Sequence, residues 1–417
     1  MSAAFRAVVS HPAKQGNMYR VPLGAQKSGI PVDFLTGVYY RPDRLPFRLI
    51  AALPAARRRR LAAWLERRRL IGLDDAVTMV SGPLPELAYR WLGYRPGNAL
   101  HDYLAARWMD RHVRPGEPGL FHGFQESCAR SLRTARRLGL VSLVESTLPP
   151  STLPLVAAEY RRLGQSWSGP DRPSPELLAE LAASDYVVAQ SRFALQSLVD
   201  HGVAPGRVIL MPLGVDIDRF RPAPADAPPR PFRLLFAGQM SVRKGVHHLL
   251  EAWSALDLPE AELLFAGAPK DRYIQELLAR TKGRHRALGF VPHARLHEVY
   301  QQADLFVFPS LAEGGVYVIF EALAAGLPCL VSANAGSAVR DGIEGFVLPV
   351  GDTAALAGRI RQLAGDAVLR RRMAAAARQR AEQFSWEHFY RRIGLMYRAA
   401  VDRGGKPFDV PLDLFER

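Results

Sequence analysis

Cysteine is scarce in this chain of 417 residues, which contains only Cys128 and Cys329. Two isolated cysteines are too few for a disulfide framework or a zinc site, so we expect both to be ordinary buried thiols. Apolar runs are shorter than the roughly 18 to 20 residues that a membrane-spanning helix requires. The apolar stretch near the N-terminus predicts a first strand and lacks the pattern of a secretory signal peptide. We therefore expect a cytoplasmic protein.

Two glycine-rich nucleotide motifs are also absent, namely G-x-G-x-x-G and G-x-x-x-x-G-K-[ST]. Their absence argues against an ordinary dinucleotide enzyme and against a P-loop NTPase. Negative charge is in deficit, with 40 Asp and Glu against 55 Lys and Arg and a net charge of +15. This balance favours anionic partners such as nucleotides, phospholipid surfaces or nucleic acid. A high-GC genome accounts for the same excess of arginine, so charge alone leaves the partner open.

The sequence contains two series of alternating strands and helices, which predict two α/β domains with parallel sheets. A proline-rich linker, RPAPADAPPR at 221–230, separates them. In the first series we expect strands at 5–10, 32–35, 120–122, 141–145, 185–189 and 208–210, with helices at 54–70, 127–138, 175–183 and 192–201. In the second we expect strands at 233–237, 262–266, 288–290, 305–309, 329–332 and 345–347, with helices at 246–256, 271–281, 296–302, 316–325 and from 353 to 400.

A basic loop follows the first strand of the second series. Gly238 and Gly245 allow tight backbone geometry on either side of it, and Arg243 and Lys244 supply two positive charges. Ligands of open α/β sheets bind beyond the carboxyl ends of the strands, where this loop lies. A solvated basic turn is the alternative interpretation of this loop taken alone.

A second loop, at 309–321, ends a strand and opens a helix. Gly314 and Gly315 leave the backbone N–H groups at the helix start accessible, which suits an anionic or hydroxyl-rich ligand. Glu313 lies in this loop, whereas Glu321 lies in the apolar helix VYVIFEALAAG, where an ionised carboxylate needs a partner. A ribose diol is one such partner, and a purely structural pair with the basic loop is the other.

These motifs resemble the retaining glycosyltransferases of family 4, which have the GT-B fold of two Rossmann-like doubly wound domains facing a central cleft. The resemblance covers nearly the whole C-terminal half, in matching order and spacing. It rests on PLGVDIDRFRP at 212–222, FAGQMSVRKG at 236–245, GFVP at 289–292, ADLFVFPSLAEGG at 303–315, FEALAAGLPCLVS at 320–332 and VRDGIEGFVLP at 339–349.

The resemblance implies roles for the site residues. Arg243 and Lys244 would hold the diphosphate of a nucleotide-sugar donor, and Glu321 would bind the ribose hydroxyls. Glu313 would bind the donor sugar, helped by the backbone amides of Gly314, Gly315 and Val316. Gly238 would lie in the donor loop, and Phe290 and Val291 would meet the base. Negative charge that develops on the leaving phosphate would be stabilised by the two cations and the helix start, without a metal or other cofactor.

The N-terminal half resembles the family less. Gly16 is the remaining candidate for close approach to the donor phosphates, since the glycine-rich loop of the family is missing. His122 is at a strand end where related enzymes keep a histidine near the reacting sugar, and a structural histidine is the alternative. Arg192 matches a position that faces the diphosphate. We expect an acceptor-binding domain at 1–220, a nucleotide-sugar domain at 221–384, and a final segment at 385–417 that braces the first domain.

Two further features keep alternatives open. Asp216-Ile217-Asp218 is a D-x-D triplet, a pattern that binds divalent cations in other glycosyltransferases. Its position beside a Leu-Gly-Val turn favours a structural turn at the domain junction instead. The Arg57–Arg69 region is basic and amphipathic, which is typical either of a solvated helix face or of peripheral contact with an anionic membrane.

The function that these patterns favour is transfer of a hexosyl group from a UDP- or GDP-sugar to a hydroxyl acceptor, with retained configuration. The acceptor would be a glycan, a lipid-linked glycan or a small molecule. A sugar-nucleotide epimerase of the same fold is a second hypothesis, although the Glu313 loop alone does not supply its acid and base. A basic nucleic-acid binder is a third, but the basic residues form no aromatic-interleaved stripe, so we expect no nucleic-acid partner.

Overall fold

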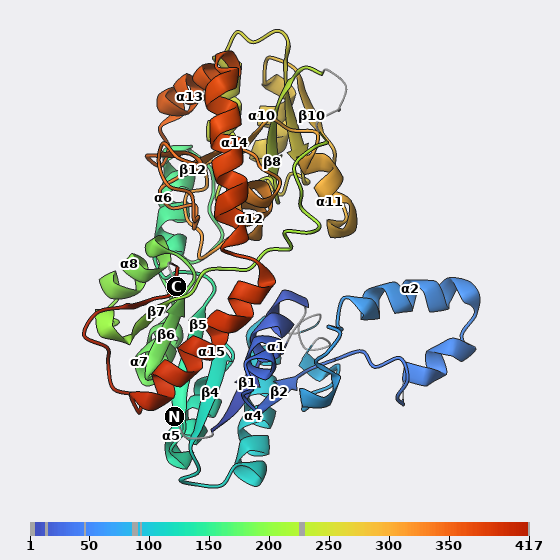
Figure 1. Cartoon of the computed structure of the whole chain (residues 1–417), viewed down its shortest axis with the longest axis vertical. Coiled ribbons are helices and arrows are strands. Elements are labelled where there is room, and N and C mark those ends of the chain that lie inside the picture. The colour runs from blue at the N-terminus through green and yellow to red at the C-terminus, as the bar shows by residue number, and fades with distance from the viewer. Residues whose placement is uncertain are drawn as a thin grey trace.

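The computed structural model describes residues 5–12, 16–45, 47–85, 91, 94–224 and 230–415. Figure 1 shows two lobes, one above the other, with the chain passing between them twice. The first passage follows β7 (Val208–Leu210), and the second joins α14 (Ala367–Glu382) to α15 (Trp386–Asp402). The two lobes correspond to the two series of strands and helices in the sequence.

The N-terminal lobe is built on a parallel sheet in the order β14-β7-β6-β5-β4-β1-β2-β3. The other strands of this sheet are β1 (Arg6–Ser10), β2 (Val32–Thr36), β3 (Val77–Met79), β4 (Gly119–Phe124), β5 (Val141–Ser146), β6 (Tyr186–Ala189) and β14 (Leu412–Asp413). Its helices are α1 (Arg20–Lys27), α2 (Ala55–Glu66), α4 (Tyr94–His112), α5 (Ala129–Leu138), α6 (Thr152–Arg162), α7 (Pro175–Ala183) and α8 (Arg192–Asp200), with short 3-10 turns η1 (Gly16–Tyr19), η2 (Phe47–Ala52), η3 (Asp74–Ala76) and η4 (Pro205–Arg207).

The C-terminal lobe has its own parallel sheet in the order β10-β9-β8-β11-β12-β13. Its strands are β8 (Phe232–Ala237), β9 (Ala261–Ala266), β10 (His285–Ala287), β11 (Leu305–Phe308), β12 (Cys329–Ser332) and β13 (Gly345–Leu348). Besides α14, its helices are α9 (Val246–Ser254), α10 (Arg272–Arg280), α11 (His293–Tyr300), α12 (Tyr317–Ala324) and α13 (Thr353–Gly365).

The strand order of the second sheet reverses between β8 and β11. The chain winds outward from β8 through β9 to β10 and then returns to place β11 on the other side of β8. The loops that leave β8 and β11 therefore diverge at the carboxyl edge of the sheet, and such a switch point is where doubly wound sheets bind ligands. All four residues of β11 are buried, as expected for a central parallel strand with helices on both faces.

Helix α15 returns from the C-terminal lobe and packs against α1 of the N-terminal lobe. The approach is close at Gly24, where an added Cβ would lie 3.0 Å from the Ile393 side chain. Val215 also forms a parallel β-bridge with Ser385, the residue just before this helix. The Arg20 guanidinium lies 4.4 Å from the Trp386 ring centre. These contacts tie the C-terminal segment to the first lobe.

The structure corrects several expected elements. The strand expected at 288–290 is wrong, because β10 lies at His285–Ala287 and the following residues form a loop. No helix was expected between the first two strands, but α1 lies there; it tolerates Pro22 in its first turn because the N–H that proline lacks has no intrahelical partner at that position. Helix α2 ends at Glu66 rather than at residue 70. Elements β3, α4, α6 and β14 were not expected.

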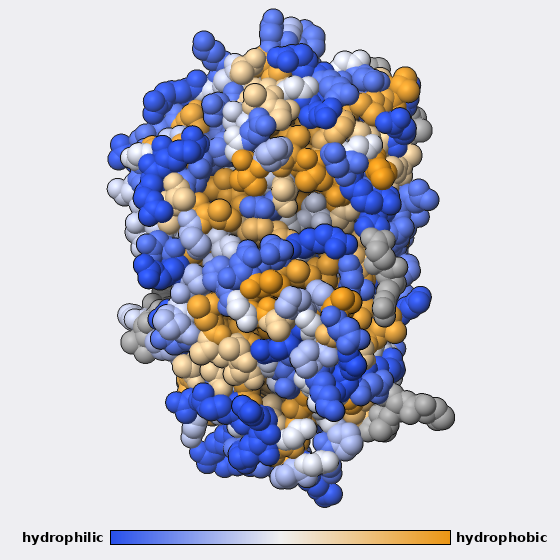
Figure 2. All heavy atoms as spheres, turned by 90° about the vertical axis from the view of Figure 1, so that its left-hand side faces the viewer, coloured by the Kyte–Doolittle hydropathy of each residue, from blue (hydrophilic) through white to orange (hydrophobic). Residues whose placement is uncertain are grey.

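The two cysteines are free and buried, which confirms the expectation for both. Among the described residues, no helix is long and apolar enough to cross a membrane. On the face shown in Figure 2, hydrophilic side chains are spread over both lobes and alternate with hydrophobic ones.

Candidate functional site

The basic loop between β8 and α9 is held in place by its glycines. Gly238 has a φ of 133° and Gly245 a φ of 68°. A Cβ added to Gly245 would lie 1.8 Å from the Pro309 carbonyl oxygen, so a larger residue cannot occupy this position. The close approach brings the end of the β8 loop against the end of β11. It explains why the two loops that were predicted separately from the sequence lie together.

Glu313 lies between the two cations of that loop. Its Oε2 is 2.6 Å from Arg243 Nη1, and its Oε1 is 2.7 Å from Lys244 Nζ. The Ser310 hydroxyl donates a further hydrogen bond of 2.8 Å to Oε1. Burial lowers the pKa of Lys244 to about 8; Glu313 opposes this shift and the Arg243 charge adds to it. The loop therefore holds two closely spaced cations, and the single Glu313 carboxylate pairs with both of them.

The Gly-Gly turn after Glu313 lies against the N-terminal lobe. A Cβ on Gly314 would lie 2.5 Å from the Thr147 carbonyl oxygen, and one on Gly315 would lie 2.8 Å from Gln190 Cβ. Thr147 and Gln190 follow β5 and β6, so the carboxyl ends of strands from both sheets face each other here. Val316 precedes α12 in an extended conformation, and no side chain caps the helix. Small residues at this turn allow the start of α12 to approach the N-terminal lobe closely.

Glu321 is buried in α12 and has two protein partners. His293 Nε2 lies 2.9 Å from its Oε1, and the Tyr300 hydroxyl lies 3.0 Å from its Oε2. The sequence showed that this carboxylate needs partners, and the structure supplies them from α11. An ionised carboxylate has about four acceptor positions, so these two contacts leave capacity for a ligand diol. Nearby on the loop before α11, Phe290 is 75% exposed and Val291 is partly buried.

His122 is fully buried, and it lies inside β4 rather than at a strand end, because the strand continues to Phe124. Its Nδ1 lies 2.8 Å from the Tyr397 hydroxyl of α15, and its Nε2 lies 3.5 Å from Glu145 Oε2. The Gln190 amide donates to the other oxygen of Glu145 at 2.6 Å. Through Glu145, His122 thus connects Tyr397 of α15 to Gln190, the residue that packs against Gly315. Its contact with a sugar or an acceptor stays a prediction.

Three other expected residues occupy different surroundings. Arg192 is exposed at the start of α8. It forms an ion pair of 3.1 Å with Asp413 of β14, a strand of the N-terminal sheet. Gly16 begins the short turn η1 after β1. Asp216 of the D-x-D triplet accepts the Arg219 N–H at 3.0 Å, and the exposed Asp218 pairs with Arg221. These contacts place the triplet in a turn at the lobe junction.

Sequence reasoning missed His293 and Tyr300. They are seven residues apart, or two turns of α11, so they lie on one face of that helix. That spacing was visible in the sequence, but their shared partner Glu321 lies on another helix. Glu145 and Gln190 were missed for the same reason, because their contact joins the ends of two separate strands. Ser310 was missed as well, although its partner Glu313 is only three residues away in the same loop.

The site as a whole combines a basic pair, helix-start amides and two buried carboxylates on one edge of the C-terminal sheet. The basic pair and the amides are suited to an anion, and a carboxylate with spare acceptor positions is suited to a diol. A nucleoside diphosphate presents both groups at once.

Comparison with known proteins agrees with this chemistry. The family profile of glycosyl transferases group 1 matches residues 219–380. A D-inositol 3-phosphate glycosyltransferase of Streptomyces scabiei is 32% identical over 349 residues, which cover 75% of this chain and 70% of that protein. Another, from Geodermatophilus obscurus, is 35% identical over 263 residues, 56% of this chain and 57% of that protein. The chain thus spans between about half and three quarters of the lengths of these relatives.

The fold agrees with solved structures over nearly the full length. The structure of Anabaena HepE in complex with UDP and glucose aligns with a TM-score of 0.63 at 16% identity, covering 94% of this chain and 99% of that one. Sucrose-phosphate synthase from Thermosynechococcus elongatus aligns with a TM-score of 0.62 at 19% identity, covering 95% and 98%. The expected fold is confirmed as GT-B, with two facing Rossmann-like domains. On the strength of its sequence relatives, the chain belongs to the group 1 glycosyltransferases.

Proposed function

We propose that this protein is a retaining, metal-independent hexosyltransferase that uses a UDP- or GDP-sugar as donor and a hydroxyl group as acceptor. The acceptor belongs to glycan, polysaccharide or glycolipid synthesis. The observation that supports this proposal most strongly is the placement of Arg243, Lys244 and Glu313 beside the Gly-Gly turn at the lobe junction. This group provides cations for a diphosphate and acceptors for sugar hydroxyls at adjacent positions.

The two cations stabilise the leaving group. Cleavage of the bond between the anomeric carbon and the β-phosphate oxygen leaves a nucleoside diphosphate, with the new negative charge on that phosphate. Arg243 and Lys244 both pair with the Glu313 carboxylate, and an incoming diphosphate competes with Glu313 for them. Preorganised donors of this kind typically contribute about 10²–10³-fold each to the rate. The amides at the start of α12 add to this field.

Retention follows from a front-face reaction. The acceptor oxygen forms its bond to the anomeric carbon on the side that the phosphate leaves, and the departing phosphate oxygen takes the acceptor proton. This course needs no protein nucleophile. Glu313 is the carboxylate nearest to the cations, and its three contacts with Arg243, Lys244 and Ser310 suit it to hold a sugar hydroxyl rather than to attack carbon.

The nucleoside is held by the α11 side of the site. Glu321 accepts hydrogen bonds from the ribose hydroxyls while His293 and Tyr300 keep its side chain oriented. The exposed Phe290 ring and Val291 meet the base. A UDP-sugar is favoured by the similarity in fold to HepE, whose structure contains UDP and glucose. The relatives named D-inositol 3-phosphate glycosyltransferases make a phosphorylated polyol one acceptor to be tested.

A donor panel tests the proposal. We expect one of the UDP- or GDP-hexoses to raise the unfolding temperature and to be turned over when an acceptor mixture is added, with EDTA present. Arg243→Ala and Glu321→Ala should each reduce turnover by at least about tenfold, whereas the exposed Arg272→Ala serves as the matched control. Unchanged turnover in both site variants would show that the site is wrongly assigned. Conversion of the donor to its epimer without acceptor would instead identify an epimerase.

We also propose that helix α2 contacts an anionic membrane surface. Figure 1 shows α2 projecting from the N-terminal lobe, away from its sheet. Exposed Leu45, Leu49 and Ile71 flank its arginines, with exposures of 70%, 64% and 82%. We expect the protein to sediment with phosphatidylglycerol vesicles but not with phosphatidylcholine vesicles. Replacement of Arg57 and Arg59 by Glu should abolish sedimentation; persistent binding by this variant would refute a contact through α2.

A further inference from the structure

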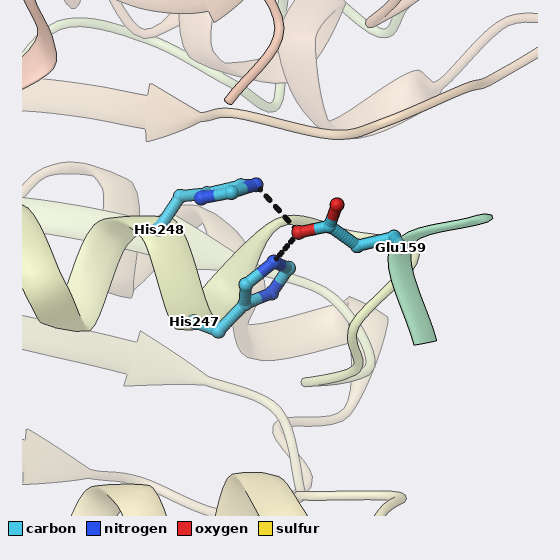
Figure 3. A group of neighbouring side chains, drawn as sticks. All are labelled: Glu159, His247 and His248. Carbon is cyan, nitrogen blue, oxygen red and sulfur yellow. Dashed lines mark hydrogen bonds and ion pairs between the residues drawn. The ribbon is translucent and has the colours of Figure 1, made fainter. Parts of the chain in front are cut away.

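A second cluster of polar side chains joins the two lobes. Glu159 lies on α6 of the N-terminal lobe, and His247 and His248 lie in the first turn of α9 of the C-terminal lobe. Figure 3 shows both imidazole rings directed at the Glu159 carboxylate. His247 Nε2 lies 2.7 Å from Glu159 Oε1, and His248 Nε2 lies 3.2 Å from the same oxygen.

The ligand atoms of the three side chains all lie within 4.8 Å of one another. Ligands at about 2.0 to 2.2 Å from a central zinc ion are separated from one another by roughly 3 to 4 Å. The donor atoms are therefore already close to the spacing of a coordination shell. Among the described residues, this is the one group of three His, Cys, Asp or Glu side chains with that spacing.

The histidines are buried but poorly satisfied. His247 is 2% exposed and His248 is 4% exposed. Both ring nitrogens of His248, and Nδ1 of His247, have no hydrogen-bond partner in the structure. Leaving a buried polar atom unpaired costs about 1–3 kcal/mol, so such groups in a native protein call for a ligand or another explanation. A metal ion bound to His248 Nε2 would give this nitrogen the partner that it lacks.

The Glu159 carboxylate has a further partner on its own helix, the Arg162 guanidinium. Arg162 contacts both carboxylate oxygens, with Nε donating to Oε2 at 2.9 Å and Nη2 donating to Oε1 at 2.7 Å. A metal ion on Oε1 would displace the hydrogen bond from Nη2, and the one from Nε to Oε2 would keep the carboxylate in place.

We propose that Glu159, His247 and His248 bind one zinc ion that joins the two lobes, with water at the fourth position. Two imidazoles and one carboxylate form a known type of zinc shell, whereas Mg²⁺ and Ca²⁺ prefer oxygen ligands. His247 presents its Nε2 lone pair to the ion by moving its proton to Nδ1, so binding through this residue needs no net release of a proton. The role proposed for the ion is to join the lobes rather than to act in sugar transfer, so the inference does not depend on the proposed function.

The consequence is a fixed arrangement of the lobes. Helix α9 begins directly after the Arg243-Lys244 loop, and α6 belongs to the other lobe. An ion held by both helices resists their separation and stabilises the folded form by mass action. Zinc should therefore raise the unfolding temperature of the whole chain.

Zinc binding is tested on the full-length protein without a polyhistidine tag, first stripped of metal by a chelator and dialysed. We expect one equivalent of Zn²⁺ in competition with a chromophoric chelator, and a rise in the unfolding temperature. His248→Ala and Glu159→Gln should each weaken the affinity by at least about tenfold. His285→Ala, which removes a histidine of the same lobe outside the cluster, should match the wild type.

X-ray absorption of the zinc-loaded wild type provides a test that does not depend on the variants folding. We expect a shell of nitrogen and oxygen at about 2.0 to 2.1 Å with two imidazoles and no sulfur. The proposal is overturned if the stripped protein binds no zinc at micromolar concentration. It is also overturned if His248→Ala and His285→Ala bind equally well, or if the absorption spectrum shows a sulfur ligand.

Discussion

The titration of Lys244 offers a sharp test of the proposed donor site. Burial lowers the pKa of this ammonium group to about 8. With that value about 90% of the molecules carry the charge at pH 7 and about 10% at pH 9. If only the charged form binds the diphosphate, the apparent Kd rises in proportion to the lost fraction, which is about tenfold between these two pH values. The second ionisation of a phosphate, with a pKa of about 6, is already about 90% complete at pH 7, so it changes the affinity little over this range.

Two neighbours should move the midpoint of this titration in opposite directions. The Arg243 charge lowers the pKa of Lys244, so Arg243→Ala should shift the midpoint upward. The Glu313 charge raises that pKa, so Glu313→Gln should shift the midpoint downward. Both variants also change the affinity itself, and for this reason the midpoint, rather than the absolute Kd, is the quantity to compare.

The assay is calorimetric titration with UDP, or with GDP if the donor panel selects it, from about pH 7 to about pH 10 at constant ionic strength. Lys244→Arg is the matched control, because a guanidinium group stays charged over this range and should remove the alkaline loss of affinity. A wild-type Kd that stays constant to pH 10 would refute the reasoning. So would midpoints that move in the same direction in the Arg243 and Glu313 variants.

Three further predictions concern single contacts. Glu321→Gln should weaken UDP or GDP binding by about 10- to 100-fold, since a charge-assisted hydrogen bond contributes about 1.5–3 kcal/mol, and a normal Kd in this variant would exclude a ribose contact. Tyr397→Phe leaves the buried Nδ1 of His122 without its partner and should lower the free energy of unfolding in urea by about 1–3 kcal/mol; an unchanged midpoint would contradict this. Gly245→Ala places a Cβ 1.8 Å from a backbone oxygen at a φ of 68° and should destabilise by at least about 1–3 kcal/mol. Gly358→Ala, in open space within α13, should instead stabilise by about 0.5–1 kcal/mol, and equal effects of the two glycine variants on the unfolding temperature would refute the steric argument.

Much of the donor site was predictable because its residues follow strands. The apolar runs of β8 and β11 predict buried parallel strands. The loops at the carboxyl ends of these two strands carry Arg243, Lys244 and Glu313. In a parallel sheet these ends meet at one edge, so the sequence placed the loops on the same side of the lobe. The resemblance to known glycosyltransferases supplied their pairing around a diphosphate.

The partners of the site residues were not predictable. Periodicity describes one helix or strand at a time, and contacts such as His293 with Glu321 join separate elements. His122 and Tyr397 are 275 residues apart in sequence, and they meet only because α15 crosses back to the first lobe. Likewise, nothing in the sequence of α2 tells whether its basic face lies against the protein or projects from it.

The sequence by itself determined that the chain forms two α/β lobes and which loops carry Arg243, Lys244 and Glu313, because burial of apolar strands and glycine geometry are local properties. The tertiary structure alone decided which groups meet across the lobe junction. Glu159 and His247 belong to different lobes, and their contact at 2.7 Å depends on how the two lobes are packed against each other. Such contacts depend on the packing of whole lobes, which no local pattern encodes.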